Sequence, residues 1–204
     1  MTAGRINRRA LLGTALSAAT GVGAVTASSA QAAELSHRDR EILEFALVLE
    51  ELQAAFYTEA ERAGALRGEL AKLATVVGGH ERDHVRTLRG ALGTHHPPSP
   101  RFDFKGATET PAAFARTAVA FEDLGVAAYK GQMPRLESRP VLAVVLSIHA
   151  VEARHAAWIR RLAGVLPAAT AFDRGRSEQA ILSIVRATRF VVVSSSNRAP
   201  GFTG

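Results

Sequence analysis

The sequence predicts an all-α fold: a four-helix bundle with one long crossover between its second and third helices, followed by a short C-terminal helix. Three observations support this prediction. Four long helical patterns follow one another, the connections between them are short, long and short, and one pattern of acids and histidines occurs twice at a nearly fixed interval. Two helical pairs joined by a single crossover give this order of connections.

The first two helices are predicted over residues 36–63 and 67–92. Ser36 is a suitable N-cap, because its hydroxyl can accept a hydrogen bond from a free backbone N–H of the first turn. Each helix ends at a glycine, Gly64 or Gly93, which tolerates the left-handed backbone that stops a helix. Gly78 and Gly79 lie within the second predicted helix, and each lowers its stability by about 1 kcal/mol relative to alanine.

The connection that follows is predicted as non-helical over residues 93–106. Pro97, Pro98 and Pro100 remove amide donors and bias the residues before them towards extended backbone. The whole connection has about 17 residues, which is long enough to cross a bundle from one end to the other.

The third helix is predicted over residues 110–130 and the fourth over residues 140–163. Thr110 caps the third helix and Pro111 lies in its first turn, where a missing amide proton costs nothing. A weaker helical pattern over residues 177–185 predicts the C-terminal helix.

The N-terminal residues 1–32 are predicted to be an export signal rather than part of the fold. Arg8-Arg9 precede a mildly apolar run that is too diluted by glycine, serine and threonine to form a stable membrane span, and Ala30-Gln31-Ala32 is a small-x-small cleavage site. The pattern is typical of a twin-arginine signal, with an ordinary secretory signal as the alternative. We therefore expect an extracytoplasmic protein with a folded domain over residues 33–190 and a disordered tail over 191–204.

Composition excludes several classes of function. The net charge is +6, but residues 1–32 hold three arginines and no acid, so the remainder has 22 basic and 19 acidic side chains, a net of +3. The basic residues are scattered and aromatics make up only 6%, which argues against nucleic-acid binding. The chain has no cysteine, so any metal must be held by oxygen and imidazole nitrogen.

The repeated pattern supplies a glutamate and a tyrosine, then a Glu-x-x-His motif, in each half of the chain. The glutamate and tyrosine recur after 72 residues and the Glu-x-x-His motif after 71. The first copy consists of Glu50, Tyr57, Glu81 and His84, and the second of Glu122, Tyr129, Glu152 and His155. Residues three apart share one face of a helix, so each Glu-x-x-His motif can chelate one ion. A third match, Glu34/His37, has no partner elsewhere and is interpreted as coincidence.

Four carboxylates and two imidazoles suit two divalent cations in the core of a bundle. Without cations, four buried carboxylates would repel one another and lose their hydration. Two divalent ions supply four positive charges against these four negative ones. We predict that Glu50, Glu81, His84, Glu122, Glu152 and His155 are metal ligands.

The phenols of Tyr57 and Tyr129 are predicted to lie on the same helix faces as Glu50 and Glu122, two turns along. They could bond the ligand carboxylates and act as redox-active, catalytic neighbours of the metals, or they could simply pack in the core with a bonded hydroxyl. His149 is interpreted as a core histidine with satisfied hydrogen bonds in preference to a metal-supporting one.

These motifs resemble the ferritin-like superfamily, and more narrowly the bacterial exported ferritin-like domain proteins, some of them desiccation-related. The resemblance covers roughly residues 37–187. The segments that support it are Leu49-Glu50, Phe56-Tyr57, Phe102-Asp103-Phe104, Phe121-Glu122, Ala128-Tyr129 and Val151-Glu152-Ala153-Arg154-His155. It implies two bound metal ions, iron in first place and manganese in second, that react with oxygen or peroxide. Gln53 departs from the family, whose members often have a second glutamate there.

We therefore expect an exported dimetal-carboxylate protein that oxidises ferrous ion or reacts with oxygen or peroxide, as a ferroxidase, a peroxidase or a manganese-catalase-like enzyme. Glu50 and Glu122 would each bind one metal, and Glu81 and Glu152 would bridge the pair. The alternative is a protective or structural protein of the stress-related type without redox turnover. The sequence leaves homo-oligomerisation open.

Overall fold

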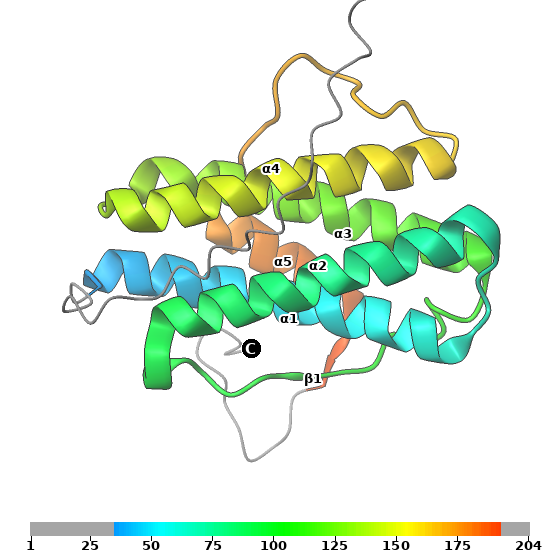
Figure 1. Ribbon diagram of the computed structural model, residues 1–204, viewed down its shortest axis with the longest axis horizontal. Coiled ribbons are helices and arrows are strands. Elements are labelled where there is room, and N and C mark those ends of the chain that lie inside the picture. The colour runs from blue at the N-terminus through cyan, green and yellow to red at the C-terminus, as the bar shows by residue number, and fades with distance from the viewer. Residues whose placement is uncertain (1–34, 193–204) are drawn as a thin grey trace, which may run out of the picture. The chain divides into compact units, whose positions relative to one another are not determined.

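The computed structural model describes residues 35–192 and confirms an all-α fold (Figure 1). The predicted export signal and residues 193–204 of the predicted tail lie outside the described residues. The described elements are α1 (His37–Ala63), α2 (Gly68–Leu92), η2 (Gly93–His95), β1 (Arg101–Phe102), α3 (Pro111–Gln132), η3 (Met133–Arg135), α4 (Arg139–Leu162), α5 (Glu178–Thr188) and β2 (Val191–Val192).

Side-chain caps set the starts of four helices. The hydroxyl oxygens accept hydrogen bonds from the backbone N–H three residues along, which satisfies a donor that has no partner inside the helix. These caps are Ser36 on α1, Thr110 on α3, Ser138 on α4 and Ser177 on α5. At its other end, α1 stops at Gly64, whose φ of 62° lies in the left-handed region as predicted.

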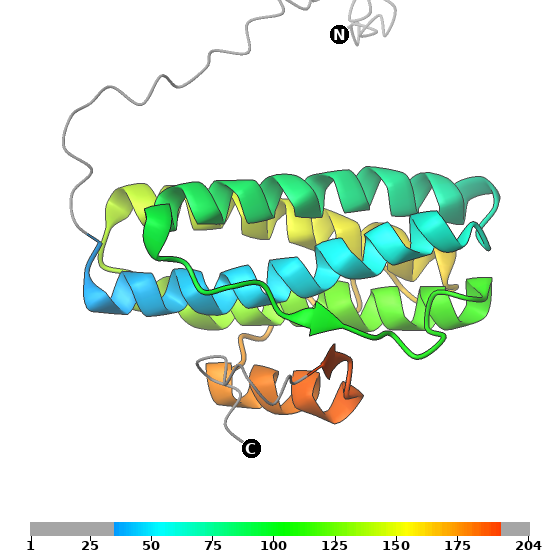
Figure 2. The same cartoon turned by 90° about the horizontal axis from the view of Figure 1, so that it is seen from below.

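The bundle consists of two helical hairpins, α1–α2 and α3–α4, which pack against each other through α1 and α3 and through α2 and α4. The crossover carries the chain from one end of the bundle to the other, so that α3 runs in the same direction as α2 (Figures 1 and 2). This arrangement brings the inner faces of all four helices to one central core.

The crossover is more regular than the sequence predicts. It begins with the 3₁₀ turn η2 and contains β1, which pairs antiparallel with β2. Phe104 then inserts a buried ring against Phe56 of α1 and Phe190 next to β2, with ring centroids 5.4 and 5.5 Å apart. The strand β2 lies within the segment predicted as tail, so the ordered part of the domain extends at least to Val192.

Two buried acids outside the repeated pattern hold the connections in place. Asp39 on α1 is fully buried, and its carboxylate accepts hydrogen bonds of 2.9 Å from the backbone N–H groups of Glu137 and Ser138 at the start of α4. Glu51 accepts hydrogen bonds from Arg89 on α2 and from Ser99 in the crossover. Both acids have structural partners and are separate from the central site.

Helix α4 is long and apolar enough to cross a membrane by length and composition alone. In the bundle its apolar residues Val141, Val145, Ile148 and Ile159 are buried in the core. A core helix passes the same test, and the core accounts for these four residues, while Leu146 of the same helix is 47% exposed.

Candidate metal centre

The six predicted ligands come together at the centre of the bundle. Glu50 lies on α1, Glu81 and His84 on α2, Glu122 on α3, and Glu152 and His155 on α4. All four glutamates are 0% exposed, while His84 is 8% and His155 3% exposed. Each helix thus contributes at least one polar side chain to a core that is otherwise apolar.

These residues form two overlapping groups, each with potential ligand atoms that lie within 4.8 Å of one another. One group contains Glu50 and His84, and the other contains Glu122 and His155. Glu81 and Glu152 belong to both groups. This is the geometry expected if these two carboxylates bridge a pair of ions and the other residues each serve one ion.

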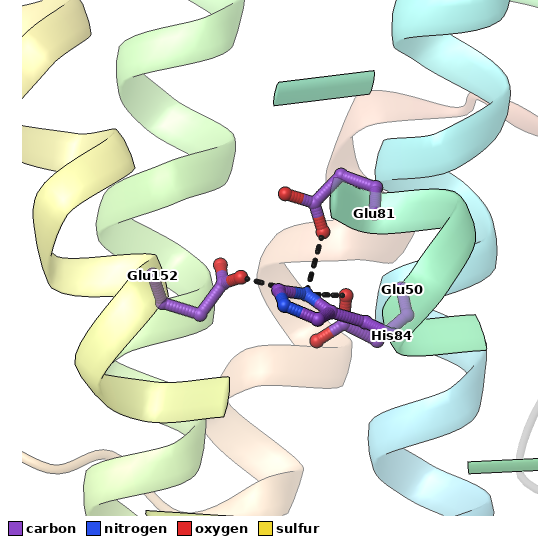
Figure 3. A group of neighbouring side chains, drawn as sticks. All are labelled: Glu50, Glu81, His84 and Glu152. Carbon is purple, nitrogen blue, oxygen red and sulfur yellow. Dashed lines mark hydrogen bonds and ion pairs between the residues drawn. The ribbon is translucent and has the colours of Figure 1, made fainter. Parts of the chain in front are cut away.

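The imidazole of His84 lies between three carboxylates, which come from α1, α2 and α4 (Figure 3). Its Nδ1 is 3.2 Å from Glu50 Oε2, 3.4 Å from Glu81 Oε2 and 3.2 Å from Glu152 Oε1. In the second group the Nδ1 of His155 is 2.9 Å from Glu81 Oε1, 3.4 Å from Glu122 Oε2 and 3.7 Å from Glu152 Oε1. Both histidines therefore direct the same ring nitrogen towards the carboxylates.

Burial and mutual repulsion dominate the electrostatics of the site. Burial, and then the charge of Glu50, raise the pKa of Glu81 well above its usual value; burial and the charge of Glu81 do the same for Glu152. Burial opposes the charged form of His84, but hydrogen bonds with Glu152, Glu50 and Glu81 outweigh it and raise the pKa to about 12. Burial also opposes ionisation of Glu50. Its hydrogen bond with His84 and further contacts outweigh burial, and the pKa of Glu50 is lowered.

Several polar atoms of the site are buried and make no contact with good hydrogen-bond geometry among the described residues, although they lie as close as 2.9 Å to one another (His155 Nδ1 and Glu81 Oε1). They are both oxygens of Glu81, Oε2 of Glu122, Oε1 of Glu152 and Nδ1 of His155. Buried polar groups almost always have a partner, because an unpaired one costs about 1–3 kcal/mol. Oxygen and imidazole nitrogen atoms gathered in this way fit divalent cations such as iron or manganese. The side chains thus fit a dinuclear metal site.

The two tyrosines bond across the hairpins, each to the glutamate of the other repeat. Tyr57 on α1 donates a hydrogen bond of 2.5 Å to Glu122 Oε1 on α3, and Tyr129 on α3 donates one of 2.5 Å to Glu50 Oε1 on α1. Burial and then the charge of the accepting glutamate raise the pKa of each phenol well above its usual value. The phenols therefore remain protonated donors and hold one oxygen of each terminal carboxylate.

Two further polar residues contact the site and were not predicted as site residues: Gln53, which is buried, and His80, which is exposed at its edge. Gln53 on α1 is buried, and its Nε2 lies 3.3 Å from Glu122 Oε1 and 3.5 Å from Glu152 Oε2. The Nδ1 of His80 lies 2.9 Å from the Nε2 of His155. The sequence spacing could have indicated both residues. Gln53 is three residues from Glu50 and His80 is four residues from His84, so each shares a helix face with a predicted ligand.

His149 does not match its interpretation as a core histidine with satisfied hydrogen bonds. It is half-buried, and its Nδ1 is buried without a hydrogen-bond partner among the described residues. Burial lowers its pKa, which favours the neutral ring. A neutral imidazole explains why this position is tolerated at the edge of the core.

Two pockets of ≈ 520 Å³ lie on the outer faces of the hairpins at equivalent places in the repeat. One lies beside the ion pair of Arg89 and Glu51 and is bordered by residues 99–102 of the crossover; the other lies beside the ion pair of Arg160 and Asp123 and is bordered by residues 167–174. The equivalence of the two hairpins therefore extends beyond the ligands to the outer surface.

Comparison with known proteins agrees with this geometry. No curated protein matches the chain at a significant level. A sequence model of the Ferritin-like domain family matches residues 38–165, which span α1 to α4 and include all six clustered acid and histidine residues. The chain belongs to the Ferritin-like domain family.

Proposed function

We propose that this chain is an exported dimetal-carboxylate protein whose site holds two iron ions and reacts with oxygen or peroxide, with oxidation of ferrous ion as the first candidate reaction. The observation that supports this most strongly is the pair of overlapping ligand groups that share Glu81 and Glu152. Manganese is the second candidate metal, because oxygen and imidazole ligands suit it as well.

The chain's own residues divide into bridging and terminal ligands under this proposal. Glu81 and Glu152 bridge the two metal positions, because each belongs to both groups. Glu50 with His84 completes one position, and Glu122 with His155 completes the other. A bound iron pair would supply electron transfer to oxygen or peroxide. The protein holds the ligands on four rigid helices and excludes bulk water from the carboxylates, all of which are 0% exposed.

Tyr57 and Tyr129 have a positioning role in this proposal and are also candidates for a catalytic redox role. Each phenol holds one oxygen of a terminal carboxylate and leaves the other oxygen facing a histidine. A carboxylate fixed in this way presents a single ligand atom in a defined direction. The carboxylate oxygen that accepts this short hydrogen bond would take the phenolic proton if the ring were oxidised. A redox role for tyrosine requires such a proton acceptor.

Metal titration of the purified domain tests the proposal. Anaerobic addition of ferrous ion should saturate at two ions per chain, and admission of oxygen should then consume oxygen and oxidise the iron. The Glu81→Ala/Glu152→Ala variant should lose both properties while keeping the helical circular dichroism spectrum. Absence of bound metal in the wild type, with thermal melting unchanged in that variant, would instead favour the protective or structural alternative.

We also propose that the chain is exported by the twin-arginine route, which carries folded proteins and so would allow metal to be loaded before export. The support is the Arg8-Arg9 pattern and the cleavage motif that ends at Ala32. Replacing both arginines by lysine should retain the protein in the cytoplasm. Unchanged export of that variant would indicate an ordinary secretory signal.

A further inference from the structure

We propose that the two metal positions are inequivalent, and that the position at Glu122 and His155 binds the first ion more tightly because His80 and Gln53 preorganise its ligands. This inference rests on the dimetal site proposed above. The six ligands themselves repeat between the two hairpins, so a difference in affinity must come from the residues that support them.

His80 supports one ligand histidine only. Its Nδ1 lies 2.9 Å from His155 Nε2, and the two rings lie edge to edge, with centroids 5.1 Å apart and planes 13° from parallel. With a metal bound to Nδ1 of His155, the neutral ring would carry its proton on Nε2 and donate it to Nδ1 of His80. Outer partners of this kind fix the tautomer and the ring orientation of a ligand histidine.

Within residues 35–192, the other ligand histidine, His84, has no partner equivalent to His80. The residue that corresponds to His80 in the second hairpin, 71 positions along, is Val151, which has no polar side-chain atom to bond to His84. All the ion-pair contacts of His84 involve Nδ1 and the carboxylates Glu50, Glu81 and Glu152. The polar contacts of its ring among residues 35–192 are therefore all with proposed ligands.

Gln53 adds a second constraint on the same side. Glu122 Oε1 accepts from both Tyr57 at 2.5 Å and Gln53 at 3.3 Å, whereas Glu50 Oε1 accepts from Tyr129. The residue that corresponds to Gln53 in the second hairpin is Gly125. A Cβ there would lie 2.7 Å from Glu152 Oε2 and 3.4 Å from Gln53 Oε1, so the glycine leaves room for both side chains.

His80 therefore contacts a ligand of one position only, while Gln53 contacts Glu122 of the same position at 3.3 Å and the shared Glu152 at 3.5 Å. Ligands that are already oriented lose less freedom when an ion binds, and losing such an outer partner typically lowers metal affinity by about 10–100-fold. The position at Glu50 and His84 is expected to bind the second ion more weakly and to exchange it faster.

Anaerobic titration with Co²⁺, followed by its visible absorption, tests the inference without relying on turnover. Two variants show which position has which affinity, because each keeps one position intact. His84→Ala keeps the position at Glu122 and His155, and His155→Ala keeps the position at Glu50 and His84. We expect His84→Ala to bind Co²⁺ about tenfold more tightly than His155→Ala. Adding His80→Val, which installs the residue of the other repeat, should weaken His84→Ala by about tenfold and leave His155→Ala unchanged.

Wild-type protein provides a second measurement that does not depend on the ligand variants folding. It should bind Co²⁺ in two steps, and His80→Val should weaken only the first, whereas the matched control Val151→Ala should change neither. Two equal steps in the wild type, or an equal effect of His80→Val on both positions, would overturn the inference while leaving the dimetal site in place. No Co²⁺ binding in the wild type would overturn the dimetal site and the inference with it.

Discussion

The α1–α2 and α3–α4 hairpins are two versions of one structural unit, and they agree in what contacts the metal positions. Each supplies one terminal glutamate, one Glu-x-x-His motif and one tyrosine that bonds to the glutamate of the other hairpin. Each also has an arginine–carboxylate pair beside an outer pocket of ≈ 520 Å³. The acid, histidine and tyrosine positions of the candidate metal centre are thus the same in both halves.

The hairpins differ in the residues one shell further out. Gln53 and His80 on the first hairpin correspond to Gly125 and Val151 on the second, and Gly78 corresponds to His149. These exchanges alter hydrogen bonds and helix contacts without altering the ligand set. The two hairpins thus supply nearly the same candidate ligands, but different residues surround those ligands. Variants at paired positions measure how much the differing residues contribute to metal binding and to stability.

The largest expected effect comes from the two bridging carboxylates, where the hairpins should behave alike. Glu81→Gln or Glu152→Gln should abolish binding of both ions, whereas Glu50→Gln or Glu122→Gln should leave one ion bound. Elemental analysis after anaerobic loading with ferrous ion measures the difference. If Glu81→Gln retains one ion and Glu152→Gln retains none, the hairpins do not share the bridging role equally.

The second largest expected effect is the pH dependence of the free energy of unfolding of the metal-free protein. The pKa values of Glu81 and Glu152 are raised above 4.5, and the pKa of His84 is raised from 6.5 to about 12. Groups with raised folded pKa values stabilise the fold fully below their unfolded pKa values and lose that contribution as pH rises. The free energy of unfolding should therefore fall as pH rises above 4.5, by about 1.4 kcal/mol per pH unit for each group that keeps its proton only in the folded state.

Urea unfolding of the metal-free protein between pH 5 and 9 measures this slope. Glu50 has a lowered pKa, so its contribution of opposite sign is confined to pH values below about 4.5. The lowered pKa values of His80 and His149 also act in the opposite sense, but only below about pH 6.5, so the slope between pH 7 and 9 is the decisive part. Metal-loaded protein should show the reverse trend, because its ligands must lose their protons to bind the ions. A metal-free protein that becomes more stable over this range would contradict the electrostatic account of the site.

The sequence predicted the parts of the molecule that follow simple spacing rules. The four long helices, their caps at Ser36 and Thr110, and the gathering of six ligands follow from local chemistry and the repeat. Pairing of β1 with β2 joins Arg101 to Val192, 91 positions along, and Phe102 to Val191, 89 positions along, which no local pattern indicates. The contact of His80 with His155 likewise depends on how α2 packs against α4.

The glycine pair in α2 illustrates the same limit. In isolation both glycines weaken a helix, but a Cβ at Gly78 would lie 2.9 Å from Tyr57 Cβ and 2.8 Å from Glu61 Oε1, whereas one at Gly79 would meet nothing within 4 Å. Gly78→Ala should therefore destabilise the fold by about 1–3 kcal/mol by separating α1 from α2. Gly79→Ala is the matched control and should stabilise it by about 0.5–1 kcal/mol. Thermal melting of both variants checks the pair, and an equal gain for both would show that α1 and α2 can move apart without cost.

The smallest expected effect separates the two arginine–carboxylate pairs. Both have N···O distances of 2.6 Å, but the Glu51 side chain is 6% exposed and that of Asp123 is 41% exposed. Arg89→Met leaves a buried acceptor with fewer donors and should cost about 1–3 kcal/mol. Arg160→Met leaves the carboxylate of Asp123 41% exposed to water and should cost less, about 1 kcal/mol including the lost bond to Leu166 O. Chemical denaturation of both variants makes the comparison. Equal losses would mean that Ser99, which also donates to Glu51, replaces the lost arginine, and Arg89→Met/Ser99→Ala should then restore the difference.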